Sequence, residues 1–258
     1  MTPPLFIVPA AELAQDPVTV GGVEGRHAVT VRRLRVGEAV QVGDGGGRVA
    51  FGRVAAIHGK DRFEVSVSDR INHPAPTPTI TVVQALIKGE RMDRALETLT
   101  EVGVDRVVPW CAANCVVRPD VRSGSGASAA ADKFRRRTRE AGKQARRAFE
   151  CQVSPVADTA QVLALAQAAD VALVLHEAAD VPLADRGVLG GLAELSDRAG
   201  ATSVVVVVGP EGGLTDEELA GLVEAGARVV RMGPTVLRAS TAGTVAVGVI
   251  MAAAGRWS

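Results

Sequence analysis

The sequence is most informative at Val204-Val205-Val206-Val207-Val208-Gly209-Pro210-Glu211-Gly212-Gly213, where five consecutive valines precede a loop of glycine and proline. Five β-branched residues in a row predict a strand that is buried on both faces, as in a parallel sheet. Thr215 and Glu218 follow, three positions apart, in the pattern of a capping box at the start of a helix. This is a strand–loop–helix junction, and ligands of parallel sheets favour that place.

The same alternation of strand and helix extends through most of the chain after residue 78. It predicts strands at Ile80–Leu86, around Val107–Val108, at Val171–Leu175, Val204–Val208 and Arg228–Arg231, and helices at Glu90–Val102, Gly187–Arg198, Asp216–Ala225 and Thr241–Ala254. We therefore expect an α/β fold with a mainly parallel sheet and helices on its faces.

The amino-terminal part of the chain has a different pattern. From Phe6 to about Val67, short β-type runs alternate with glycines, and Gly43-Asp44-Gly45-Gly46-Gly47 predicts a turn. Three prolines within residues 74–78 then block both helix and central strand. We predict a small β-barrel at residues 1–73, a linker at 74–78 and an α/β domain at 79–258.

Composition narrows the function classes. Lys and Arg number 29, as do Asp and Glu, so any basic surface must be local, and 47% hydrophobic residues are enough for a real core. The three cysteines lack the neighbouring ligands of a zinc site, so we expect no metal and a reducing, cytoplasmic setting. No apolar stretch predicts a signal peptide or a membrane segment.

A local basic surface is predicted at two places. Within residues 133–147, Arg135, Arg139, Lys143 and Arg146 share one face at helical spacing. A smaller cluster lies in the β-domain. The candidate RNA-binding residues are Arg26, Arg32, Arg33, Arg35, Arg135, Arg139, Lys143, Arg146 and Arg147. The simpler alternative is a solvated helix face, but a nearly unbalanced run of cations favours phosphate binding.

Two further junctions resemble the one after the valines. Met232-Gly233-Pro234 leads through Arg238 to the last helix, and Leu175-His176-Glu177 ends a strand. The two Gly-Pro loops follow adjacent strands and are candidates to wall one pocket, and Leu175-His176-Glu177 is a third candidate edge. None contains the G-x-G-x-x-G pattern of a dinucleotide site. The alternative for each loop is a turn whose glycines serve backbone geometry alone, and for His176 a structural histidine.

These motifs, taken in order, resemble the ribosomal RNA small subunit methyltransferase E family of the SPOUT superfamily. The matching segments are His27–Gly37 with Asp44-Gly45, Gln84–Lys88, Glu101–Val104, Glu140–Arg147, Val208–Gly213, and Met232–Pro234 with Leu237-Arg238 and Thr241-Ala242. The resemblance implies a PUA-like barrel that binds RNA and a SPOUT domain with a carboxyl-terminal trefoil knot. It implies N3-methylation of a uridine in 16S ribosomal RNA, free or in the assembled small subunit, by a homodimer.

The resemblance also implies S-adenosylmethionine as the cofactor. The residues matched to its site are Leu175, His176, Glu177, Gly209, Pro210, Glu211, Gly212, Gly213, Met232, Gly233, Pro234, Leu237, Ser240 and Thr241. The family commonly has Arg where this chain has Thr235 and Glu where it has Ser240, so no role is transferred to those two side chains from relatives.

A uridine imide nitrogen becomes nucleophilic only when it loses its proton. We hypothesise that Arg238, helped by the helix start at Ser240-Thr241, stabilises the resulting charge on the uracil oxygens. Glu211 and His176 are the candidate general bases. Two alternatives stay open: a SPOUT ribose 2′-O-methyltransferase, and a non-catalytic RNA-binding protein of ribosome assembly.

Overall fold

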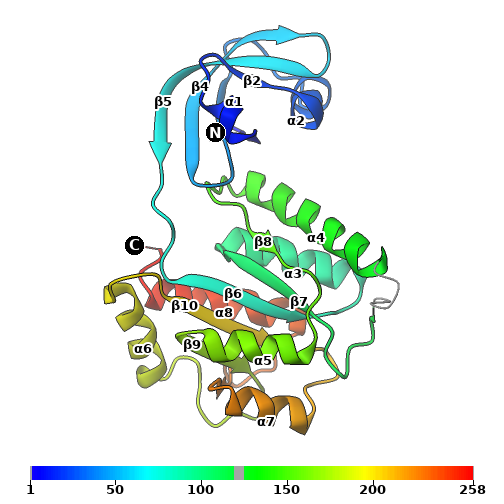
Figure 1. Cartoon of the computed structure of the whole chain (residues 1–258), viewed down its shortest axis with the longest axis vertical. Helices are drawn as coiled ribbons and strands as arrows, with labels where there is room; N and C mark the ends of the chain where they lie inside the picture. Colours follow the sequence, from blue (N-terminus) through cyan, green and yellow to red (C-terminus); the bar gives the residue numbers. More distant parts are fainter. Residues whose placement is uncertain (1, 119–124, 258) are drawn as a thin grey trace. The chain divides into compact units, whose positions relative to one another are not determined.

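A computed structural model, which describes residues 2–118 and 125–257, divides the chain into two compact units (Figure 1). The first unit contains Met1–Ala75 and Gly142–Glu150, and the second contains Pro76–Ala141 and Cys151–Ser258. The first boundary lies in the proline-rich segment at residues 74–78. The inclusion of Gly142–Glu150 in the first unit differs from the predicted division, which placed all of 79–258 in one domain.

Backbone pairing explains this difference. The amide of Glu150 donates to the carbonyl of Gly45 at 2.9 Å, and the amide of Gly47 donates to Ala148 at 3.0 Å. The segment therefore pairs with a turn about a hundred residues earlier in the chain. Such pairing leaves no local periodicity in the sequence.

The first unit is built on a five-stranded sheet in the order β1-β3-β4-β5-β2. Its elements are β1 (Leu5–Ile7), α1 (Ala10–Leu13), β2 (Val18–Val20), α2 (Gly22–Arg26), the π-helical turn η1 (His27–Val31), β3 (Ala39–Gly43), β4 (Arg48–His58) and β5 (Arg62–Asn72). The pair β1–β3 is parallel and the other pairs are antiparallel. Phe6 and Phe63 meet edge to face in its core, with ring centroids 5.1 Å apart.

Asp44 organises the predicted glycine turn between β3 and β4. Its Oδ1 accepts hydrogen bonds from the amides of Gly46 and Arg48, and Gly45 and Gly47 adopt positive φ, which suits glycine. Burial by itself raises the pKa of the Asp44 carboxyl, but the hydrogen bonds from Gly46 and Arg48 outweigh it and hold the pKa below its usual value.

The second unit contains a six-stranded sheet in the order β11-β9-β10-β6-β7-β8, and all its strand pairs are parallel. Its strands are β6 (Thr79–Ala85), β7 (Arg106–Trp110), β8 (Gln152–Val153), β9 (Val171–Leu175), β10 (Ser203–Val208) and β11 (Arg228–Val230). The valine strand β10 lies between β9 and β6, and Val204–Val208 are buried. The predicted parallel α/β sheet is confirmed.

Helices cover both faces of this sheet (Figure 1). They are α3 (Gly89–Val102), α4 (Ser125–Gln144), α5 (Thr159–Ala168), α6 (Arg186–Asp197), α7 (Asp216–Glu224) and α8 (Ala239–Ala253). Helix α8 packs against α3, α6, β6 and β10, whereas α5 packs against α7 and β9. Gly103 ends α3 at φ 110°, a left-handed backbone conformation that favours glycine. The trefoil knot stays a prediction.

Several helices of this unit have the ends that local sequence predicts. Thr215 and Glu218 form the expected capping box of α7. Helix α5, which was not predicted from the sequence, begins with a second capping box of Asp158 and Gln161. Within residues 2–118 and 125–257, no helix is both long and apolar enough to cross a membrane.

Arg146 lies in the turn that follows α4 and has a positive φ of 58°, which is unusual for a residue other than glycine. Its guanidinium donates to the carbonyl oxygens of Pro3 at 2.7 Å, Lys143 at 2.6 Å and Gln144 at 3.0 Å. All four residues lie in the segments of the first unit or at the end of α4 that belongs to it. The three bonds hold the backbone in a conformation that costs free energy for any residue except glycine.

We predict that Arg146→Ala destabilises the first unit by about 1.5–3 kcal/mol, because charged hydrogen bonds are lost while the strained φ remains. Arg146→Gly loses the same bonds but relaxes the backbone, so it should be more stable than Arg146→Ala by about 1–2 kcal/mol. Urea denaturation followed by circular dichroism, with hydrogen exchange in β1 and β3 as the local probe, measures both. Equal stability of Arg146→Ala and the unchanged protein would contradict this role.

Candidate functional site

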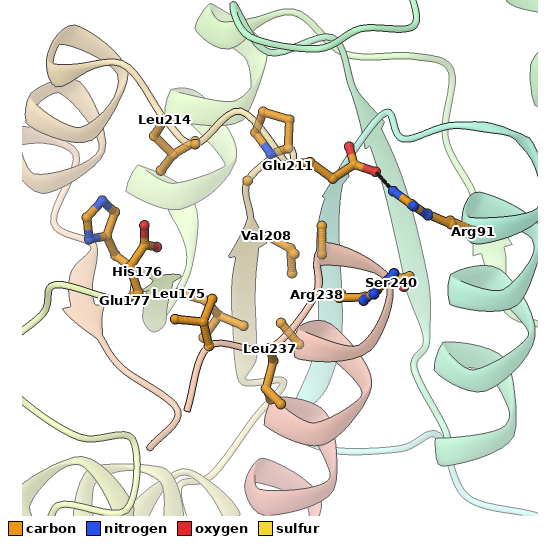
Figure 2. A pocket seen from close by; sticks show the side chains of 16 residues that line it. Arg91, Leu175, His176, Glu177, Val208, Glu211, Leu214, Leu237, Arg238 and Ser240 are labelled. Atoms are coloured by element: carbon orange, nitrogen blue, oxygen red, sulfur yellow. Dashed lines mark hydrogen bonds and ion pairs between the residues drawn. The ribbon is translucent and has the colours of Figure 1, made fainter. Parts of the chain in front are cut away.

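A cavity of about 330 Å³ opens in the second unit at the carboxyl ends of β9 and β10 (Figure 2). Three chain segments contribute most of its wall: the end of β9, the loop after β10, and the start of α8. The lining residues are Arg91, Leu175, His176, Glu177, Val208, Gly209, Pro210, Glu211, Gly213, Leu214, Val236, Leu237, Arg238, Ala239, Ser240 and Ala242. The three predicted junctions thus come together.

A smaller hollow of about 100 Å³ shares Leu175 to Glu177, Val236 to Leu237 and Ala242 with this cavity. Its other lining residues are Arg231, Met232, Gly233, Pro234 and Thr235. A Cβ added at Gly233 would meet no atom within 4 Å, so there is open space beside this lining residue. The second Gly-Pro loop therefore forms one wall of a continuous depression.

Twelve of the fourteen candidate cofactor residues line the cavity or the hollow; Gly212 and Thr241 do not. A Cβ at Gly212 would lie 3.0 Å from the Cβ of Asn114, so Gly212 faces a neighbouring loop. Thr241 is exposed, and its amide bonds to the carbonyl of Arg238. Both were predicted from their place in a motif, which does not define the direction a residue faces.

The two guanidinium groups in the lining of the cavity lie on one side of it (Figure 2). Figure 2 shows Arg91, Arg238 and Ser240 on the side away from Leu175, His176 and Glu177. Arg91 on α3 donates to Oε1 of Glu211 at 3.1 Å. Among the described residues, the exposed guanidinium of Arg238 has no recorded hydrogen-bond or ion-pair partner.

Arg238 is also the N-cap residue of α8, and no side chain caps that helix. The first amides of a helix lack partners within the helix and carry a partial positive charge. Arg238, Ala239 and Ser240 line the cavity, so the helix start lies at its wall. This is a place where developing negative charge is stabilised.

The hydrogen bonding of His176 limits what its ring does. Its Nδ1 accepts from the amide of Ala178 at 3.2 Å, and its own amide donates to the carbonyl of Val230 at 3.0 Å. In the neutral ring the proton is then on Nε2. Nδ1 of His176 is thus engaged within the protein, and its role as a candidate general base stays a prediction.

A second loop supports Gly209–Gly213 from behind. Asn114 donates from Nδ2 to the carbonyls of Gly212 and Gly213, at 3.3 and 3.2 Å. The buried carboxylate of Glu218 accepts from the amides of Ala113 and Thr215, so the capping box also holds this second loop in place.

Burial raises the pKa of the Cys115 thiol, which lies in the same loop as Asn114.

Sequence reasoning missed Arg91, Asn114 and Glu218 as parts of the site. The place of Arg91 in the sequence could have indicated a site residue. It lies in the first turn of the helix that follows β6, and the carboxyl end of a parallel strand is where ligands bind. Asn114 had no such signal, since its loop carries no motif. In the described part of the chain, no three His, Cys, Asp or Glu side chains come together as a metal site.

The candidate RNA-binding arginines divide into two groups. Arg26, Arg32, Arg33 and Arg35 lie in or near η1 of the first unit; their side chains are exposed and have no recorded partner among the described residues. The candidate RNA-binding residues at 133–147, in contrast, have hydrogen-bond or ion-pair partners within the protein. Lys143 forms an ion pair with Glu24 at 2.9 Å in which both side chains are largely buried. Arg135 pairs with Asp132, Arg146 binds backbone carbonyls, and Arg139 and Arg147 also have partners.

Comparison with known proteins agrees with this geometry. The family described as "RNA methyltransferase domain" matches residues 73–251, and "RNA methyltransferase PUA domain" matches residues 21–68. The chain is 40% identical over 242 residues to a ribosomal RNA small subunit methyltransferase E of Mycobacterium bovis, covering 92% of this chain and 87% of that protein. The chain belongs to the ribosomal RNA small subunit methyltransferase E family.

More distant members of this methyltransferase family agree over similar lengths. The Bacillus subtilis protein of the same name is 26% identical, with 90% of this chain and 88% of that protein covered. The crystal structure of the Neisseria gonorrhoeae protein, bound to S-adenosyl methionine, has a TM-score of 0.79 at 24% identity and covers 97% and 98% of the two chains. That likeness shows that the methyltransferase fold extends through both units.

We predict that Asn114→Ala loosens the Gly209–Gly213 loop, because two hydrogen bonds to its carbonyls are lost. The amide of Gly213, which donates to Pro210 at 3.0 Å, should exchange its hydrogen roughly fivefold faster, equivalent to about 1 kcal/mol. Hydrogen-exchange mass spectrometry measures this. Asn72→Ala, an exposed asparagine on β5, is the control, and equal exchange in both variants would exclude the supporting role.

Proposed function

We propose that this protein methylates N3 of a uridine in small-subunit ribosomal RNA, with S-adenosylmethionine as the methyl donor. One observation carries the proposal: three strand-end loops meet at one cavity, and an arginine at a helix start lies in its wall. Family membership supplies the substrate class, since the curated relatives are named small-subunit ribosomal RNA methyltransferases.

The cavity suits such a cofactor. Leu175, Val208, Leu214 and Leu237 offer apolar contacts for a planar base, and the open backbone at Gly233 leaves a cradle that a side chain would fill. Backbone groups of the two Gly-Pro loops and Nε2 of His176 are the groups placed to bind the polar edges. When bound, S-adenosylmethionine supplies a methyl group already activated on a sulfonium.

The residues of the chain then act on the acceptor. The guanidinium of Arg238 and the first amides of α8 stabilise negative charge on the uracil oxygens, which favours loss of the N3 proton. Glu211 is the remaining candidate to receive that proton, because Arg91 occupies only its Oε1, whereas the Nδ1 of His176 is engaged by Ala178. Orientation within the cavity contributes much of the rate.

We also propose that the exposed arginines of the first unit bind phosphates of the RNA, and that the protein acts in the cytoplasm as a homodimer. Val236, Val245 and Trp257, which lie before, on and after α8, are exposed, and a second copy would cover such apolar side chains. Sedimentation equilibrium tests the dimer.

Mass spectrometry of nucleosides from methylated ribosomal RNA tests the reaction. We expect N3-methyluridine from unmodified small-subunit RNA incubated with the protein and cofactor. A methyl group on ribose 2′-oxygen would overturn the assignment in favour of a ribose methyltransferase, and no cofactor binding by calorimetry would favour a non-catalytic RNA-binding protein.

Arg238→Gln should lower kcat by about 10²–10³, because it removes a donor aimed at charge that develops in the transition state. The dissociation constant of S-adenosylmethionine should change little, since the charge is needed only during reaction. Methyl transfer from labelled cofactor gives kcat, and calorimetry gives affinity. A rise in KM with unchanged kcat would show that Arg238 contributes only to binding.

Gly233→Val should abolish measurable cofactor binding while the protein stays folded, because the branched side chain occupies the hollow. Gly190→Val is the matched control: it also meets no atom within 4 Å, but it lies on the exposed side of α6. Calorimetry with S-adenosylmethionine compares them. Unchanged affinity in Gly233→Val would remove the second Gly-Pro loop from the cofactor site.

A further inference from the structure

We infer that Arg91 is a binding site for a backbone phosphate of the RNA beside the target nucleotide, and that Glu211 occupies it until RNA arrives. This inference rests on the proposed function. Nothing in the sequence motifs assigned a role to Arg91, which enters the site only because α3 begins at the carboxyl end of β6.

The division of the cavity is the first argument. Leu175 lies on one side of the cavity (Figure 2), with His176 and Glu177 beside it, and offers an apolar contact for the adenosine part of the cofactor. The two guanidinium groups in the lining, of Arg91 and Arg238, lie on the other side (Figure 2). If Arg238 faces the uracil, the second guanidinium on that side is placed for the charged part of the same strand, its phosphate.

The character of the Arg91–Glu211 pair is the second argument. Its N–O distance is 3.1 Å, and the side chains are 53% and 34% exposed. An ion pair so open to water contributes little to stability, so its exchange for another anion costs little. A guanidinium binds two phosphate oxygens at once, which makes phosphate a better partner than a single carboxylate oxygen.

The surroundings of Arg91 are the third argument. Helix α3 begins at Gly89 without a side-chain cap, so its free amides add positive charge beside Arg91, and Lys88 precedes it. Glu90 is the acidic residue of that first turn, and it is exposed. Arg91 itself lines the cavity, whereas Arg94, one turn further along α3, does not.

Equilibrium binding of unmodified small-subunit ribosomal RNA by the full chain tests this site. Arg91→Gln should weaken RNA binding about tenfold and make the log–log salt slope shallower by about 0.7–0.9, the effect of one lost phosphate contact. Affinity for S-adenosylmethionine should stay unchanged. Arg91→Lys keeps the charge but cannot donate to two phosphate oxygens in the geometry of a guanidinium, so it should restore the salt slope but only part of the RNA affinity.

Two further variants separate the site from a structural ion pair. Glu211→Gln removes the competing charge, so it should tighten RNA binding by about two- to fivefold. Arg94→Gln is the matched control, with the same loss of charge on the same helix, and should leave the slope unchanged. Circular dichroism melting confirms folding of each variant.

Four results would overturn the inference: an unchanged salt slope in Arg91→Gln, an equal change in Arg94→Gln, weaker RNA binding in Glu211→Gln, or a loss of cofactor affinity in Arg91→Gln, which would assign Arg91 to the cofactor carboxylate. The proposed function is judged separately from methyl transfer by the unchanged protein. If that protein makes N3-methyluridine while Arg91→Gln binds RNA normally, the phosphate site fails and the function stands.

Discussion

The parallel pairing of β10 with β6 and β9 is the constraint on which the site depends. In that register Val208 lies beside Gln84 on one side and beside Leu175 on the other, so three strands end at the same level. The loops that follow must then leave the sheet together. A shift of one residue in β10 would turn its buried valines around and would move the Gly-Pro loop away from His176 and Arg238.

The loops at this edge of the sheet are held in place by side chains from other parts of the chain. Asn114 holds the Gly209–Gly213 loop through hydrogen bonds to the carbonyls of Gly212 and Gly213, and Glu218 accepts from the amides of Ala113 and Thr215 next to it. Arg231 does the same for the loop after β9, where it donates to the carbonyls of Ala179 and Asp180. Two of the loops at the cavity are therefore held through bonds to their backbone carbonyls.

The basic run at 133–147 shows how charge in a sequence differs from charge available to a ligand. Lys133 and Arg137 pair with Asp93 and Glu97 of α3, and Lys143 pairs with Glu24. These cations fasten α4 and the segment after it. The arginines near η1, in a shorter and less regular cluster, are exposed, and this exposure is why we propose them as the phosphate-binding residues.

Local chemistry determined much of this protein from the sequence by itself. Five valines in a row predict a buried parallel strand, Thr215 with Glu218 predicts a helix start, and Gly103 predicts a helix end, because strand burial, capping and left-handed backbone each depend on residues close together in the chain. Ordered motifs then indicated the family. Only the tertiary structure decided which neighbours those residues meet. It returned Gly142–Glu150 to the first unit, turned Gly212 toward Asn114, and brought Arg91 to Glu211 from 120 positions away. Contacts of that kind depend on strand order and packing, which no local pattern records.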